Sequence, residues 1–150
     1  MDPTGADIDG LRIAIWIASV IAASIVFRRV TGRPIRAVAP GNSSFVETRA
    51  SGRSLRKIIS RIGGARNCLM VAVTTSKLVI CPQFPFTLMF LPEIYGLEID
   101  VPRSRIKDVR IEKGFFSRRV VVDYLSAHGA SRSFELRLSD PDAFRKALTN

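Results

Sequence analysis

The side chains best able to do chemistry in this sequence are cationic, and they are concentrated in one stretch. Residues 28–66 contain ten arginines and lysines against one acid, Glu47, a net charge of +9 within a chain of net charge +10. Such side chains bind phosphate groups, which both anionic membranes and nucleic acids present. The residues that we predict to bind anionic lipid are Arg28, Arg29, Arg53, Arg56, Lys57, Arg61 and Arg66.

Catalysis and metal binding are not indicated. The chain has one histidine, His128, and two cysteines, Cys68 and Cys81, which together fall short of the four ligands of a structural zinc site. It contains no glycine-rich phosphate loop, no HExxH motif and no nucleophile elbow. Because His128 lies in an expected turn, serine and cysteine nucleophiles lack an evident base. We therefore expect no catalytic activity, no cofactor and no metal.

The elements that position the cations begin with a long apolar segment. Residues 13–27 contain no charged side chain and no polar face, unlike the surface helix of a soluble domain. Extended to residues 11–30, the segment is long enough to cross a bilayer. We expect a transmembrane helix over residues 11–30, or otherwise a helix buried in a core.

The charges on either side of this segment predict its orientation. Acids precede it, whereas Arg28 and Arg29 follow it, which is the reverse of a signal peptide. The positive-inside rule then places residues 1–10 outside as a short extracytoplasmic tail, and the rest of the chain in the cytoplasm. We expect a bacterial inner membrane as the location.

Small residues recur on the apolar segment. Ala14, Ala18 and Ala22 are spaced by four and would share one face of a helix, where small side chains allow two helices to approach closely. This face could form a homodimer contact, although alanine is also common in such segments.

After the apolar segment we expect a linker, a first strand and then a basic amphipathic segment. Residues 31–43 are expected to form a linker, because they contain two prolines and two glycines without a periodic pattern. A first strand is expected over residues 45–49, ended by Ser51 and Gly52. Residues 53–62 then place apolar side chains at helical spacing with cations between them. They predict either an interfacial helix that meets anionic lipid, or a helix or strand lying on the core.

From residue 68 onward, apolar and polar side chains alternate with a period of two residues, which indicates a mainly β, antiparallel domain. Cys68 and Cys81 would face each other if the hairpin turn near residues 74–76 has two or four residues, yet in the cytoplasm we expect them to be reduced. Asp140 and Pro141 predict a C-terminal helix, as N-cap and first helical residue. The expected strands are 68–73, 77–81, 106–112, 119–125 and 133–139.

The connection over residues 82–97 is unusually apolar for a loop. Its aromatic residues Phe84, Phe86, Phe90 and Tyr95 either pack on the core or form a hydrophobic contact loop that enters a membrane or meets a partner.

The order of these parts resembles that of pleckstrin-homology-like (PH-like) domains of the bacterial PH and GRAM-like kind. The likeness covers residues 44–150 and is carried by VTTSKLVI at 73–80, VPRSRIKDV at 101–109 and FELRLSDPDAF at 134–144. It implies a seven-stranded antiparallel β barrel with a C-terminal capping helix, often used to bind lipids or proteins. It also implies basic residues in the loop between the first two strands.

These features predict a non-enzymatic, single-pass membrane protein whose cytoplasmic PH-like domain binds protein partners or the anionic membrane surface. The competing hypothesis is a nucleic-acid-binding protein that uses the basic residues 28–66. It is the weaker one, because clear aromatic residues for base stacking are not found beside the arginines.

Overall fold

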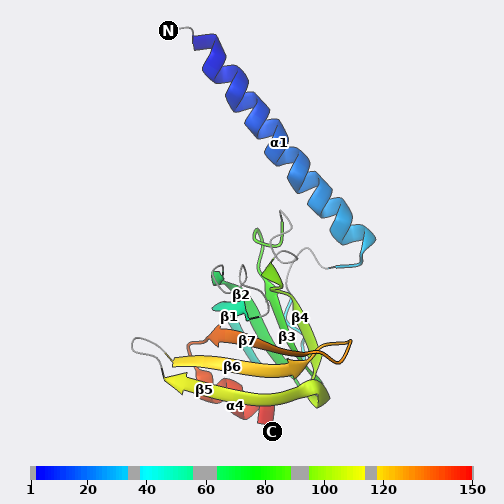
Figure 1. The fold of residues 1–150 in the computed structure, drawn as a ribbon, viewed down its shortest axis with the longest axis vertical. Coiled ribbons are helices and arrows are strands. Elements are labelled where there is room, and N and C mark those ends of the chain that lie inside the picture. Colours follow the sequence, from blue (N-terminus) through cyan, green and yellow to red (C-terminus); the bar gives the residue numbers. More distant parts are fainter. Residues whose placement is uncertain (1–2, 34–37, 56–63, 89–94, 114–117, 150) are drawn as a thin grey trace.

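The computed structural model describes residues 3–33, 38–55, 64–88, 95–113 and 118–149. The protein is mainly β, with an apolar helix at its N-terminus and a short helix at its C-terminus (Figure 1). The elements are α1 (Pro3–Val30), β1 (Ser43–Ser54), β2 (Ala65–Thr74), β3 (Lys77–Pro82), β4 (Ile99–Pro102), the 3-10 helix η1 (Arg103–Arg105), β5 (Ile106–Lys113), β6 (Arg118–Leu125), β7 (Ser131–Arg137) and α4 (Pro141–Thr149).

The strands form one seven-stranded antiparallel sheet in the order β4-β3-β2-β1-β7-β6-β5. β1 joins the two halves of the sheet, because it pairs with β2 and, over its residues 51–54, with β7. In the part of the chain that the structure describes, β4 and β5 are the two edges. The sheet is open, so the closure into a barrel that the resemblance implies is not seen.

Alternating side chains place one face of the strands into a common core. The inward side chains predicted for residues 119–125 and 133–139 are confirmed: Val120, Val122, Tyr124, Phe134, Leu136 and Leu138 are buried, and they pack with Leu69, Val71, Val73, Leu78 and Ile80 of β2 and β3. The alternation is not strict, because Val121 is buried as well, and the prediction that Glu135 points outward is wrong, since it is buried in its ion pair with Arg53.

α4 closes one end of this core, as the sequence predicted. Asp140 caps the helix, because its Oδ1 accepts a hydrogen bond from the Ala143 amide at 2.9 Å. Phe144 is fully buried and meets Phe45 edge to face, with ring centroids 5.5 Å apart. α4 lies at the end of the β domain opposite to α1 (Figure 1).

β1 is longer than predicted. The expectation that the first strand ends at Ser51 and Gly52 is wrong, because β1 continues to Ser54. A Cβ on Gly52 would lie 2.8 Å from both the Glu135 carbonyl oxygen and Phe134 Cε1. Glycine therefore allows β1 and β7 to approach closely here and does not end the strand.

The segment expected over residues 53–62 is only partly described. Arg53 and Ser54 belong to β1, so a helix does not begin at residue 53. Residues 56–63 lie outside the described residues, and for them the prediction stays a prediction.

The β2–β3 hairpin has a two-residue turn at Thr75 and Ser76, but the prediction that a turn of this length sets the two cysteines opposite each other is wrong. The register of the hairpin sets Cys81 opposite Met70. Cys68 and Cys81 therefore do not face each other, and both are free.

α1 begins at Pro3 and not near residue 11, so most of the segment expected as a tail is helical. Its stretch Asp9–Val30 is long and apolar enough to cross a membrane. Of the 18-residue apolar segment within this stretch, 6% is buried in the protein. This exposure does not fit the alternative of a core helix. Figure 1 shows α1 projecting from one end of the β domain.

Replacing Gly52 with alanine is expected to destabilise the β domain by about 1–3 kcal/mol, because the new Cβ would overlap atoms of β7. The measurement is chemical denaturation of the full chain in mild detergent, followed by circular dichroism. Gly41→Ala is the matched control, since a Cβ on Gly41 would meet no atom within 4 Å. Equal stability of the two variants would show that β1 and β7 do not approach this closely.

Candidate functional site

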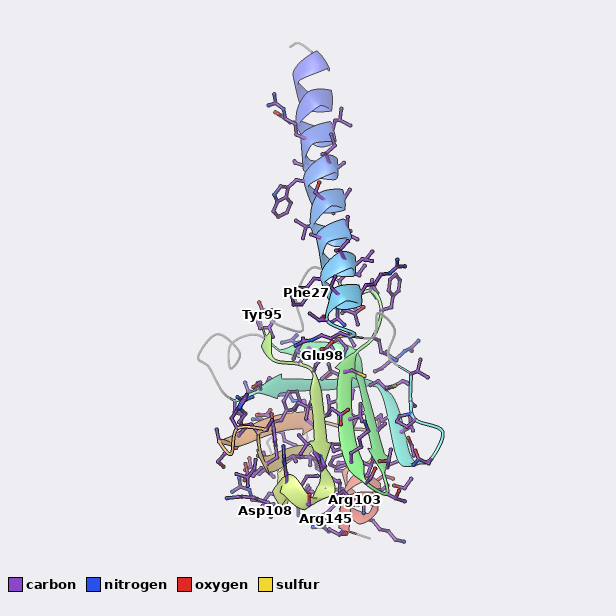
Figure 2. All side chains as sticks on the ribbon, turned by 90° about the vertical axis from the view of Figure 1, so that its right-hand side faces the viewer. Phe27, Tyr95, Glu98, Arg103, Asp108 and Arg145 are labelled. Carbon is purple, nitrogen blue, oxygen red and sulfur yellow. The ribbon has the colours of Figure 1, made fainter. Side chains whose placement is uncertain are left out.

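The last turns of α1 are held on the β domain by an ion pair between a buried arginine and a partly buried glutamate. Arg28 is fully buried, and its Nη2 donates a hydrogen bond to Oε1 of Glu98 at 2.5 Å. Ser24, one turn earlier on the same helix face, is also fully buried. Figure 2 shows Phe27, Tyr95 and Glu98 at this end of the domain. Side-chain contacts therefore attach the helix to the domain, in addition to the covalent connection through the following residues.

A glycine cap brings a second arginine to the same carboxylate. Gly32 has a φ of +67°, its amide donates to the Arg29 carbonyl at 3.3 Å, and the Arg33 amide donates to the Arg28 carbonyl at 2.8 Å. This turn directs Arg33 so that its Nη1 lies 3.3 Å from Oε2 of Glu98. Glu98 therefore bridges one buried and one exposed arginine.

The predicted lipid-binding cations lie in different environments. Arg28 is buried in its ion pair, whereas Arg29 beside it is exposed. Arg53 donates through Nε and Nη2 to Oε2 of Glu135, at 3.1 and 2.8 Å. Arg66 is exposed at the start of β2. The other three, Arg56, Lys57 and Arg61, lie outside the described residues.

Two of these cations share a polar groove, here called the arginine groove. Its volume is about 350 Å³, and Arg53, Arg66, Arg137 and Glu135 are among its lining residues. It lies where the β1–β2 pairing becomes irregular, and Asn67 there has a φ of +52°. Three arginines against one carboxylate give this groove a positive potential.

A second, apolar hollow adjoins the arginine groove. Its volume is about 300 Å³, and its walls are Cys68, Phe86, Tyr95 and Leu97. Both spaces are bordered by Gly64, Ala65 and Arg66. An apolar space and a cationic space therefore meet at Arg66, an arrangement that the sequence did not predict.

The predicted hydrophobic contact loop divides between core and surface. Tyr95 is half-buried and packs against the core, and Leu88 is buried. Phe84 and Phe86 are exposed by 55% and 46%. Phe90 lies outside the described residues. Packing on the core therefore holds for Tyr95, whereas contact of Phe84 and Phe86 with a membrane or a partner stays a prediction.

A further hollow lies at the opposite end of the domain, with a volume of about 500 Å³. Thr75, Arg103 and Lys146 line it, and Arg103 donates a hydrogen bond to the carbonyl of Ala147. This contact ties η1 to the end of α4. Figure 2 shows Arg103 at the end of the domain away from Glu98.

The predicted dimer face of α1 is not covered by the β domain. Ala14, Ala18 and Ala22 are all exposed. The homodimer contact through these residues stays a prediction.

The two cysteines are poor nucleophiles and poor metal ligands. Burial, and to a smaller extent the Glu98 carboxylate, raises the pKa of the Cys81 thiol from its ordinary value of 9.0 to about 11. Burial also raises the pKa of Cys68. Both thiols are therefore protonated at neutral pH. Among the described residues, no three His, Cys, Asp or Glu side chains are placed to hold a metal ion.

The acids that organise this site were missed by the sequence analysis. Glu98 is 70 residues from Arg28, and Glu135 is 82 residues from Arg53. A buried arginine needs a charge partner, but the sequence did not indicate that Arg28 would be buried. No local pattern indicates which acid pairs with it.

The fold and this site define a class of protein, in which a β domain is attached through a buried arginine to a helix long and apolar enough to cross a membrane. No protein-family model matches the sequence, and a comparison with curated proteins finds no match.

Replacing Glu98 with alanine is expected to loosen the attachment of α1, because the Arg28 charge would lose this carboxylate. We expect the free energy of unfolding to fall by about 3 kcal/mol. Chemical denaturation in detergent measures this loss. Asp100→Ala is the control, since it removes only the exposed ion pair with Lys77, which is expected to contribute less than about 1 kcal/mol. Equal losses in the two variants would show that Glu98 does not hold the helix.

The raised pKa of Cys81 predicts a pH dependence of stability. Above pH 9.0 the unfolded thiol ionises, while the folded thiol keeps its proton until the pH nears its folded pKa of about 11. The stability due to this group is complete below pH 9 and is lost as the pH rises through 11. We expect denaturation curves to show a smaller loss over this range in Cys81→Ser than in the native chain. Parallel losses would contradict the raised pKa.

Proposed function

We propose that this protein is a single-pass membrane protein in which α1 spans the bilayer and holds a PH-like β domain at the cytoplasmic surface. The domain is a non-enzymatic binding module that engages protein partners or the anionic membrane surface. The observation that carries the proposal lies in α1, which exposes apolar side chains along its length while Arg28 in its last turns is buried against the domain.

The exposure of α1 supports a lipid environment. Leu11, Ile13, Ile15 and Trp16 are each more than half exposed. At roughly 25 cal/mol per Å² of apolar surface, this exposure is unfavourable in water and is relieved in hydrocarbon. The helix then ends, at its domain side, in the head-group layer.

The charges at the two ends of α1 support the orientation. Arg28, Arg29 and Arg33 lie at the domain end, whereas Asp7 and Asp9 lie at the other. By the positive-inside rule, the β domain is cytoplasmic and the N-terminus is outside. A bacterial inner membrane fits this arrangement.

The number and order of the elements support a PH-like domain over residues 44–150. Seven antiparallel strands are followed by a helix whose Phe144 enters the core. The exposed cations Arg29 and Arg66 support contact with anionic lipid, because Arg66 borders the same hollow as Tyr95, at the α1 end of the domain.

Extraction of cell membranes with alkaline carbonate tests the anchor. The native chain is expected to stay in the membrane. Ala18→Arg places a charge in the middle of α1 and is expected to cost about 2.5–3.5 kcal/mol of insertion free energy, so part of the chain should become soluble. The matched variant Ala18→Leu should stay in the membrane. A native chain that washes off would overturn the proposal.

Two further experiments test the orientation of the chain and the nucleic-acid alternative. Alkaline phosphatase, which needs disulfides, should be inactive when fused after Asn150 if the domain is cytoplasmic. Single-stranded DNA should not bind saturably to the full chain in phosphatidylcholine nanodiscs at physiological salt; tight, saturable binding would favour the nucleic-acid alternative.

A further inference from the structure

Two spaces of opposite character meet in the β domain. The apolar hollow is walled by Cys68, Phe86, Tyr95 and Leu97, and the arginine groove carries three guanidinium groups. They share the border formed by Gly64, Ala65 and Arg66. With about 300 and 350 Å³, each reaches the lower end of the size range of small-molecule sites.

The two spaces lie at the end of the domain to which α1 is attached. Leu97 directly precedes Glu98, the residue that binds Arg28. Figure 2 shows Phe27, Tyr95 and Glu98 at this same end of the domain. If α1 spans the membrane, the apolar hollow therefore lies near the head-group layer, within reach of a lipid of the same leaflet.

The arginine groove suits an anion. Glu135 is buried and holds Arg53 through two hydrogen bonds to one oxygen, which fixes this guanidinium in place. Arg66 and Arg137 also line the groove, and both are exposed. One carboxylate cannot balance three arginines, so the groove retains positive charge for a phosphate oxygen.

The apolar hollow suits a hydrocarbon chain better than a peptide. Apart from Arg66 at its border, the side chains in its wall are largely apolar. A peptide backbone placed there would have to bury N–H and C=O groups against carbon and sulfur, which is costly. An acyl chain carries no such groups, and its burial is favourable.

We propose that the two spaces together bind one anionic phospholipid, with its phosphate on Arg66 and Arg137 and part of an acyl chain against Phe86 and Leu97. This inference rests on the proposed membrane anchor. It deepens that function by identifying the ligand as a single lipid molecule held in a built site, in place of diffuse attraction to a charged surface.

Native mass spectrometry of the full chain in detergent tests the site by counting bound molecules. The probes are dioleoyl phosphatidic acid, dioleoyl phosphatidylcholine and inorganic phosphate. We expect one phosphatidic acid to bind more tightly than either other probe. Arg66→Glu should weaken its binding about tenfold or more. Arg105→Glu, the same charge change in η1 at the far end of the domain, should leave binding unchanged.

A second pair of variants tests the apolar part. Phe86 lines the hollow, whereas Phe84 in the same loop is exposed and does not line it. Phe86→Ala should weaken binding of phosphatidic acid about fivefold, while Phe84→Ala should not. Equal effects of the two variants would indicate general insertion of the loop into lipid and would overturn the proposal.

Two further outcomes would also overturn it. Inorganic phosphate that binds as tightly as phosphatidic acid would identify a site for a free anion, and binding unaffected by Arg66→Glu would place the lipid elsewhere. Carbonate extraction of the native chain separates this failure from failure of the anchor. If the native chain stays in the membrane but does not bind phosphatidic acid selectively, the anchor stands and the lipid site does not.

Discussion

The ion pair between Arg28 and Glu98 is the constraint on which the arrangement of this protein depends. A fully buried guanidinium is costly unless its charge is paired, so the last turn of α1 and the residues before β4 must stay together. Arg33 uses the other oxygen of the same carboxylate, which also fixes the turn after the helix. The domain therefore does not rotate freely about the end of α1, and the same end of it always faces the helix.

A second acid, Glu135, which is itself buried, organises the cationic side of the domain in the same way. Glu135 lies 2.8 Å from Arg53 and 3.7 Å from Arg119, within the pairing of β7 with β1 and β6. Its carboxylate neutralises part of their charge and holds Arg53 in place. The attraction for a further anion then comes mainly from Arg66 and Arg137, which are exposed beside it. Buried acids thus decide which arginines are available to a ligand.

Local patterns could be predicted from the sequence, and long-range pairing could not. The alternation over residues 119–125 and the cap at Asp140 depend on neighbours in the chain, so residue type and spacing were enough. Gly52 was misread as the end of a strand, because glycine favours both turns and close strand contacts, and only the position of β7 distinguishes them. The cationic residues were identified from the net charge of residues 28–66. Glu98, 70 residues from its arginine, leaves no local signal.

The charge of residues 28–66 is consequently not that of a uniform polycation. A polycation that only neutralises phosphates keeps its arginines in solvent, where any phosphate can reach them. Here Arg28 is used to attach the helix, Arg53 is fixed by an acid, and Arg66 borders an apolar hollow. In the proposed function, attachment and recognition therefore depend on different arginines, so a change in one need not disturb the other. A membrane-anchored binding module of the proposed kind requires that separation, because its ligand site must stay exposed while its orientation is held by the buried Arg28.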